Sequence, residues 1–333
     1  MVTYNMEIKN TGPILTDLLT AIDTFSAEEH VYVTAAIPGE ELTGSPFRPT
    51  LSAFGIRELP LPRVLNNLGI RSLTLNSIDD QDALFQLDSA AANEKDIKRF
   101  FKDGNVIKEL RSIFSNCRTI AFDDWATLSG ASSLWDGLLT DVIKPLGKVD
   151  LEIIFYLGDP IEKLSFEVDE VLDIISAFSE HGRVTFALDE NEAISLWMVL
   201  NGVQAGTEIG EQSTADLKKK YFSIFRTMNV TRLLIYSAND AIVYSEGEQF
   251  VFLRKKVDQN IELASDARQN YIAGHSVGVL MKLDVGHCIA LGLIVFACLG
   301  ELKSIPERKD ISTYIQRWMQ DLEKPERTQL YQD

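Results

Sequence analysis

Few side chains in this sequence have both the type and the spacing that catalysis or metal binding needs. The histidines are His30, His181, His275 and His287, and the cysteines are Cys117, Cys288 and Cys298. No two histidines are three or four residues apart, so none form a metal-ligating pair on one helix face. For His275, near the start of a helical pattern, a hydrogen-bonded structural role is the common one. The cysteines lack CxxC spacing, which indicates reduced core thiols rather than a zinc site or a disulfide framework.

The short motifs of several large enzyme classes are absent from the chain. There is no Gly-x-Ser-x-Gly elbow, no Walker loop and no Gly-x-Gly-x-x-Gly fingerprint. Hydrolase, P-loop and glycine-rich dinucleotide-binding interpretations therefore lack support. The basic clusters Lys218-Lys219-Lys220 and Arg254-Lys255-Lys256 are typical of solvated faces or helix ends.

Acidic residues at expected turns and helix starts are the remaining candidates, and each has an ordinary structural use. Asp189-Glu190-Asn191-Glu192 follows an apolar run, and an acidic first turn complements the dipole of a helix. Asp159-Pro160 is a common turn signal. Ser265 or Asp266 can cap the helix that follows. Chemistry at these positions needs a further argument.

Composition and charge exclude several classes of partner. The chain has 333 residues, of which 45% are hydrophobic and 24% charged, which is typical of a globular protein. Its 32 Lys and Arg against 49 Asp and Glu give a net charge of −17, so nucleic acid and anionic membranes are repelled. Residues 1–9 lack a signal-peptide pattern, and the longest apolar stretch, 288–299, is shorter than the roughly 18 residues of a membrane span. We expect a soluble cytoplasmic protein without a nucleic-acid or membrane partner.

Apolar runs of strand length alternate with helical patterns, which predicts an α/β fold with a mostly parallel central sheet and helices on both faces. The expected parallel strands are 31–37, 71–77, 118–123, 151–156, 183–188 and 231–236, and an antiparallel edge hairpin is expected over 241–244 and 249–253. Helices are expected over 270–282, 285–299 and 310–322, the second buried on all sides. We expect one domain over 1–333. Five prolines within 38–62 and the irregular stretch 79–94 predict a small or reduced lid within 38–94.

Four stretches resemble the ribokinase-like (PfkB) family of carbohydrate kinases over about residues 115–325. They are Phe122-Asp123-Asp124-Trp125 with Trp135 further on, Ile154 to Asp159-Pro160, Val184 to Glu192, and Tyr271-Ile272-Ala273-Gly274 continuing to Gly278. The resemblance implies a ribokinase-like fold, and an ATP-dependent kinase activity toward a sugar or nucleoside with magnesium. Because the lids of this family often pair, it also implies a homodimer.

The family's most specific motif, Gly-Ala-Gly-Asp before the Ala-Gly pair, is not preserved here. Alignment on Ala273-Gly274 places Asp266-Ala267-Arg268 at the glycine positions and Gln269 at the position of the catalytic Asp. The glycine amides hold phosphoryl charge and the Asp takes the proton from the sugar hydroxyl. A neutral Gln cannot act as that base. In an alternative alignment Leu263-Ala264-Ser265-Asp266 is the turn and Asp266 the base, which needs an extra helical turn before Tyr271 and still lacks both glycines.

The resemblance also assigns the remaining site residues. It places nucleotide contacts at Ala267, Arg268 and Asn239, and substrate contacts at Glu40, Gly55, Arg57, Asp124 and Asp159. The family's Asn-x-x-Glu motif, which acts through magnesium-bound water, becomes Asp189 to Glu192, so these two carboxylates are the implied metal residues.

The losses at Gly55 to Arg57, at Asp266 to Arg268 and at Gln269 affect three separate tasks. We therefore expect a catalytically impaired pseudokinase that binds or regulates through a small molecule. The alternative is an active sugar or nucleoside kinase that uses Asp266, or another acid such as Asp159 or Glu192. A third hypothesis is an interaction scaffold whose pocket is filled.

Overall fold

The computed structural model describes residues 5–8, 11–24, 32–35, 72–74, 98, 101–116, 119–123, 125–126, 130–203, 214–237, 240–246, 248–253, 265–302 and 306–322. The strands are β1 (Asn5–Ile8), β2 (Tyr32–Ala35), β3 (Ser72–Thr74), β4 (Thr119–Asp123), β5 (Leu151–Tyr156), β6 (Gly182–Asp189), β7 (Arg232–Tyr236), β8 (Asp240–Ser245) and β9 (Glu248–Leu253). The longer helices are α1 (Thr11–Thr24), α5 (Gly104–Asn116), α6 (Ala131–Gly137), α8 (Ser165–Ala177), α9 (Glu190–Leu200), α10 (Thr214–Thr227), α11 (Ser265–Leu280), α12 (Val285–Leu302) and α13 (Arg308–Leu322). Shorter helical segments are η2 (Leu138–Ile143), α7 (Lys144–Leu146), η3 (Pro160–Glu162) and η4 (Phe178–Glu180).

One sheet contains all the described strands, in the order β1-β9-β8-β7-β6-β5-β4-β2-β3. Strands β2 to β7 run parallel, β8 is antiparallel to both of its neighbours, and β1 pairs in parallel with β9. The predicted mostly parallel sheet and its antiparallel hairpin are confirmed. The sequence did not predict β1, which adds one more strand beyond the hairpin.

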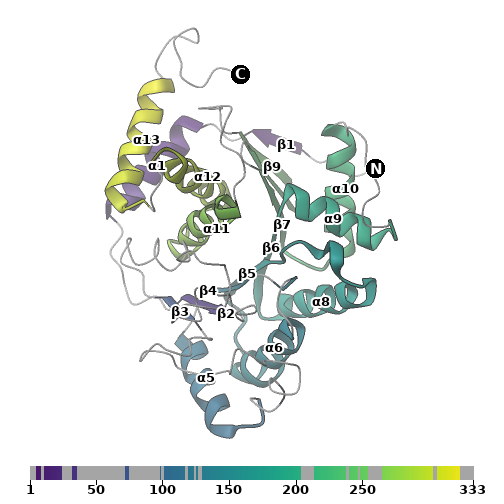
Figure 1. Ribbon diagram of the computed structural model, residues 1–333. Helices are drawn as coiled ribbons and strands as arrows, with labels where there is room; N and C mark the ends of the chain where they lie inside the picture. The colour runs from purple at the N-terminus through teal and green to yellow at the C-terminus, as the bar shows by residue number, and fades with distance from the viewer. Residues whose placement is uncertain are drawn as a thin grey trace, which may run out of the picture.

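Side chains alternate between the two faces of the sheet, and each face has its own core. In β5, Ile153 and Phe155 pack under α5, α6, α8, α9 and α10, whereas Ile154 and Tyr156 pack under α1, α11, α12 and α13. Figure 1 shows these two helical layers on opposite sides of the sheet. The predicted helices on both faces are therefore confirmed.

The helical hairpin of α11 and α12 packs closely because glycine lies at its contact points. A Cβ atom at Gly274 would lie 2.5 Å from the carbonyl oxygen of Leu291, and one at Gly278 would lie 2.8 Å from Cα of Cys288. All described side chains of α12 from Cys288 to Cys298 are buried, as the sequence predicted. The thiols of Cys288 and Cys298 are reduced and buried, also as predicted, while Cys117 lies outside the described residues.

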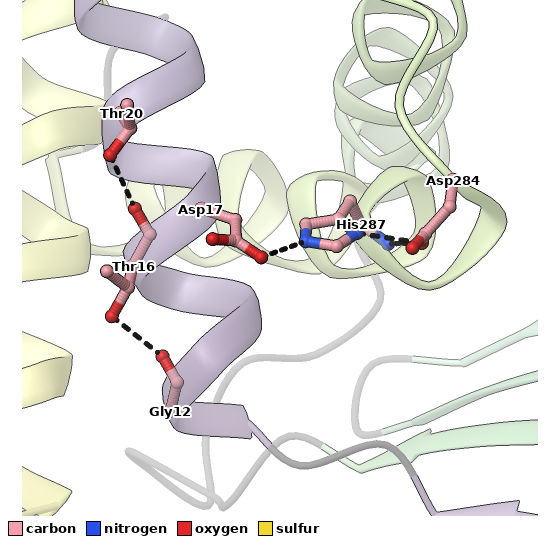
Figure 2. Close-up of polar contacts among 6 residues, drawn as sticks. All are labelled: Gly12, Thr16, Asp17, Thr20, Asp284 and His287. Carbon is pink, nitrogen blue, oxygen red and sulfur yellow. Dashed lines mark hydrogen bonds and ion pairs between the residues drawn. The ribbon is translucent and has the colours of Figure 1, made fainter.

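A histidine joins α1 to the start of α12. Nε2 of His287 lies 3.3 Å from Oδ2 of Asp17 on α1, and its Nδ1 lies 2.7 Å from Oδ1 of Asp284. The same Oδ1 accepts the backbone N–H of His287 at 3.0 Å, so Asp284 caps α12. Figure 2 shows this bridge beside the threonines of α1, whose hydroxyls donate to carbonyls one turn earlier.

Candidate active site at the carboxyl edge of the sheet

Parallel pairing brings the ends of four strands to one edge. Asp123, the last residue of β4, is in register with Tyr156 of β5, and Asp189 of β6 is in register with Tyr236 of β7. In open α/β sheets, ligands bind outside the carboxyl ends of the strands. The acidic stretch at Asp189 and the turn at Asp159 both lie at this edge.

Asp189 and Glu192 form a reciprocal cap at the start of α9. Oδ1 of Asp189 accepts the backbone N–H of Glu192 at 2.8 Å, and Oε2 of Glu192 accepts the N–H of Asp189 at 2.9 Å. Glu192 is buried, with 4% of its surface exposed. The structural use anticipated for this acidic first turn is therefore present. Magnesium binding by the same pair stays a prediction.

Asp159 caps a short turn rather than a long helix. Its Oδ1 accepts the N–H of Ile161 at 3.1 Å, at the start of η3. The residue is exposed, which is compatible with the turn signal seen in the sequence. A sugar contact at Asp159 also stays a prediction.

Helix α11 runs antiparallel to β5 and β7, because its end at Val279 lines the same cavity as the first residues of these strands, and its first turn therefore lies toward the carboxyl edge. The ring of Tyr271 stacks on Tyr236, the last residue of β7, with centroids 4.1 Å apart and planes 6° apart. Further along α11, the hydroxyl of Tyr156 lies 3.1 Å from Oγ of Ser276 and 3.3 Å from Nδ1 of His275. Residues before Tyr271 therefore lie at or beyond the ends of the strands.

The first turns of α11 hold the residues aligned with the family's catalytic motif. The helix begins at Ser265, five residues before the start expected at Asn270, so the backbone of Asp266, Ala267, Arg268 and Gln269 is helical. Asp266 lies in the first turn and Gln269 one turn further along. The amino end of such a helix has unpaired N–H groups and partial positive charge, which favour an anion.

Gly274 has a packing role in the α11–α12 hairpin. Its close contact with α12 means that only a residue without Cβ fits there unless the helices separate. The Ala273-Gly274 pair thus has a packing role that ties it to this position in the hairpin, and Gln269 lies five residues before Gly274 in a continuous helix.

His275 has the structural role that was expected of it. It is 1% exposed and hydrogen-bonds to Tyr156. Burial, together with a smaller effect of the charge of Arg232, lowers the pKa of His275 to about 3, so the imidazole is neutral at pH 7. The link between His275, Ser276 and Tyr156 was missed by sequence reasoning, because the tyrosine is more than a hundred residues away in the chain.

Several predicted site residues lie outside the described residues: Glu40, Gly55, Arg57, Asp124 and Asn239. The lid predicted within 38–94 does too, apart from β3. The described residues of the motif that contains Asp124 belong to the core. Trp125 is buried, with its Nε1 donating to Oγ of Ser132 at 2.8 Å, and Trp135 packs against both Phe122 and Phe155.

Among the described residues, no group of three His, Cys, Asp or Glu side chains is placed to hold a metal ion. The same part of the chain contains no helix with the length and hydropathy that crossing a membrane requires.

Comparison with solved structures identifies the fold. A single-residue mutant of phosphofructokinase-2 from Escherichia coli aligns with a TM-score of 0.52 and 9% identity, covering 88% of this chain and 100% of that one. The tetrameric inhibited form of the same enzyme aligns with a TM-score of 0.51 and 10% identity, covering 88% of this chain and 100% of that one. A protein assigned as ribokinase II from Escherichia coli, in its apo form, aligns with a TM-score of 0.50 and 14% identity, covering 87% of this chain and 100% of that one.

The chain therefore has the ribokinase-like fold, and it is carbohydrate-kinase-like in architecture. This fold was the expectation from the four sequence stretches. No family model matches the sequence, and no curated protein is similar to it in sequence.

Proposed function

We propose that this protein is a relative of the carbohydrate kinases that binds a small molecule at the carboxyl edge and is impaired in phosphoryl transfer. The backbone of α11 carries the proposal. Residues 266–268 are helical and none is glycine, whereas the family's motif holds the phosphoryl group on a glycine turn. With Gly274 as the anchor of the alignment, Gln269 replaces the base, and its neutral amide cannot take a proton from a hydroxyl.

The ligands that this edge favours are ATP with magnesium and a sugar or nucleoside. The amino end of the 16-residue α11 favours phosphate, and the carboxylates of Asp189 and Glu192 are of the type that magnesium prefers. The implied nucleotide contacts at Ala267 and Arg268 lie in the same first turns of α11. A homodimer formed through the lid stays part of the proposal.

One observation favours a second candidate, an active kinase with Asp266 as its base. The alternative alignment requires an extra helical turn before Tyr271, and α11 has that turn because it begins at Ser265. Asp266 then occupies the first turn, where the family's catalytic Asp lies relative to its helix.

The two candidates differ in what two substitutions do to turnover. We would titrate Mg-ATP into the pure protein by calorimetry, and then assay phosphoryl transfer over a panel of sugars and nucleosides. The variants are Asp266→Asn and Gln269→Asp, with Asp169→Asn on the exposed face of α8 as a matched control.

Binding of Mg-ATP without phosphoryl transfer supports the impaired kinase. If phosphoryl transfer occurs in Gln269→Asp but not in the wild-type protein, this supports the ungapped alignment as well. Transfer that is lost in Asp266→Asn and retained in Asp169→Asn contradicts impairment and establishes the second candidate. If neither the nucleotide nor any acceptor shifts the melting temperature, the filled-pocket scaffold is the remaining interpretation.

A further inference from the structure

A cavity of about 820 Å³ opens at the other end of the sheet, where the parallel strands begin. This volume lies in the range of ligand sites, which is about 300–1,000 Å³. Its walls come from the first residues of β5, β6 and β7, from the end of β8, and from the turn between α11 and α12. It is therefore separate from the carboxyl edge, and nothing in the proposed function uses it.

Strand register explains why charged side chains gather in this cavity. Glu152 and Arg183 are paired residues of β5 and β6, and Arg232 and Ser245 are paired residues of β7 and β8. All four share the face of the sheet that carries Ile154 and Leu234, because side chains alternate along a strand. They lie in two neighbouring rows beneath the α11–α12 hairpin, because Arg232 is in register with Thr185 of β6 and not with Arg183.

The charges of the cavity differ from those of the whole chain. Its lining includes three cations, Arg183, Arg232 and Lys282, against three acids, Glu152, Glu246 and Asp284, in a protein with a net charge of −17. Two of the acids are already engaged. Glu152 pairs with Arg183 and lies 3.8 Å from Arg232, and Asp284 caps α12 and contacts His287.

Arg232 has donor capacity that the described residues do not use. Its side chain is 22% exposed, and among these residues its one charged contact is the long ion pair with Glu152. A guanidinium group has five N–H donors, and a carboxylate or phosphate accepts two of them in parallel. The charge of Arg232 also reaches across the cavity to His275, whose neutral imidazole does not compete with it for an anion.

Lys282 is the second cation, and its backbone is unusual. Its φ is 57°, the left-handed conformation that usually selects glycine at the end of a helix. The N–H of Leu283 donates to Gly278 at 3.1 Å, which closes the helix in this conformation. A lysine at this position costs backbone energy and places a charged side chain at the rim of the cavity.

We propose that this cavity binds a small anionic metabolite, recognised by a carboxylate or phosphate group that accepts hydrogen bonds from Arg232 and pairs with Lys282. The hydroxyl group of Ser245, at the register position opposite Arg232, lines the same wall, and Val243, Val279 and Val285 supply apolar surface for the rest of the ligand.

The test is calorimetric titration with inorganic phosphate, pyrophosphate and citrate at constant ionic strength. The variants are Arg232→Gln and Lys282→Gly, with Lys309→Gln, an exposed residue of α13, as a matched control and Arg268→Gln to report binding at the amino end of α11. Lys282→Gly removes the charge and suits the left-handed backbone, so weakened binding in a protein at least as stable as the wild type cannot result from misfolding.

We expect one of the three anions to bind, with an affinity about tenfold weaker in each cavity variant and unchanged in Lys309→Gln. Tighter binding of pyrophosphate than of citrate indicates that the natural ligand carries a phosphate group. Tighter binding of citrate indicates that it carries a carboxylate group. Absence of binding by all three anions up to about 10 mM, or binding that is lost in Arg268→Gln and retained in both cavity variants, contradicts the proposal. Neither result bears on turnover at the carboxyl edge.

Discussion

Asp189 and Glu192 each accept a hydrogen bond from the other's backbone N–H, at 2.8 and 2.9 Å, so the acidic pair that most resembles the kinase motif is also the cap of α9. The observed structural role and the proposed metal-binding role therefore concern the same two side chains. Substitutions that preserve one role and remove the other can separate them.

Loss of the cap should be measurable in stability. Asp189→Ala leaves N–H groups at the start of α9 without their acceptor and should lower the free energy of unfolding by about 1 kcal/mol. Asp189→Ser keeps an acceptor of suitable length and should lose much less. Urea denaturation of the two variants checks this, and equal losses would contradict the role of the side chain as a cap.

Magnesium provides the second readout for this pair. If Glu192 takes part in a metal site, magnesium should raise the melting temperature of the wild-type protein. Glu192→Gln retains an oxygen that can accept the N–H of Asp189 but lacks the charge, so it should remain folded and lose the magnesium effect. The same shift in both proteins would place any metal elsewhere.

Gly274 should tolerate no larger side chain. In Gly274→Ala the new Cβ would meet the carbonyl oxygen of Leu291 at 2.5 Å, which forces α11 and α12 apart and should cost about 1–3 kcal/mol. Gly104→Ala, at the start of α5, is the control, because its Cβ would meet nothing within 4 Å. A neutral Gly274→Ala would contradict the close packing of α11 on α12 at this position.

Acid should destabilise the protein through His275. Its folded pKa of about 3 lies below the ordinary value of 6.5, so its contribution is complete above about pH 6.5 and is lost as the pH falls toward 3, because the unfolded chain alone binds the proton. Between about pH 7 and pH 5 this amounts to about 2 kcal/mol. Denaturation of His275→Gln should show a pH dependence weaker by that amount, and parallel curves for the two proteins would disprove the prediction.

Two buried tyrosines should respond in opposite directions to loss of the hydroxyl group. Within the described residues the hydroxyl of Tyr244 has no hydrogen-bond partner, and burial raises the pKa of this side chain. Tyr244→Phe should therefore stabilise the protein by about 1 kcal/mol. Tyr156→Phe removes the contacts with Ser276 and His275 and should destabilise it by a similar amount. Thermal unfolding of both variants is the measurement.

The sequence by itself determined the sheet and its helical layers. The strand Leu151–Tyr156 is buried on both faces apart from Glu152, and a mainly apolar run of strand length is a local property that a sequence displays. The same holds for α12, whose apolar residues on all sides predicted its burial. The four-residue strand β1 has no continuous apolar run, and it joins the sheet by pairing with the edge of β9.

Tertiary structure decided the two sites. At the carboxyl edge, the stacking of Tyr271 on Tyr236 positions α11 relative to the strands, and the sequence pattern placed the start of this helix five residues too late. At the opposite edge, Glu152, Arg183 and Arg232 come from three strands far apart in the chain, and their proximity follows from strand register alone. A single sequence shows the spacing of apolar residues within each helix and strand. Which helices and strands become neighbours depends on long-range packing.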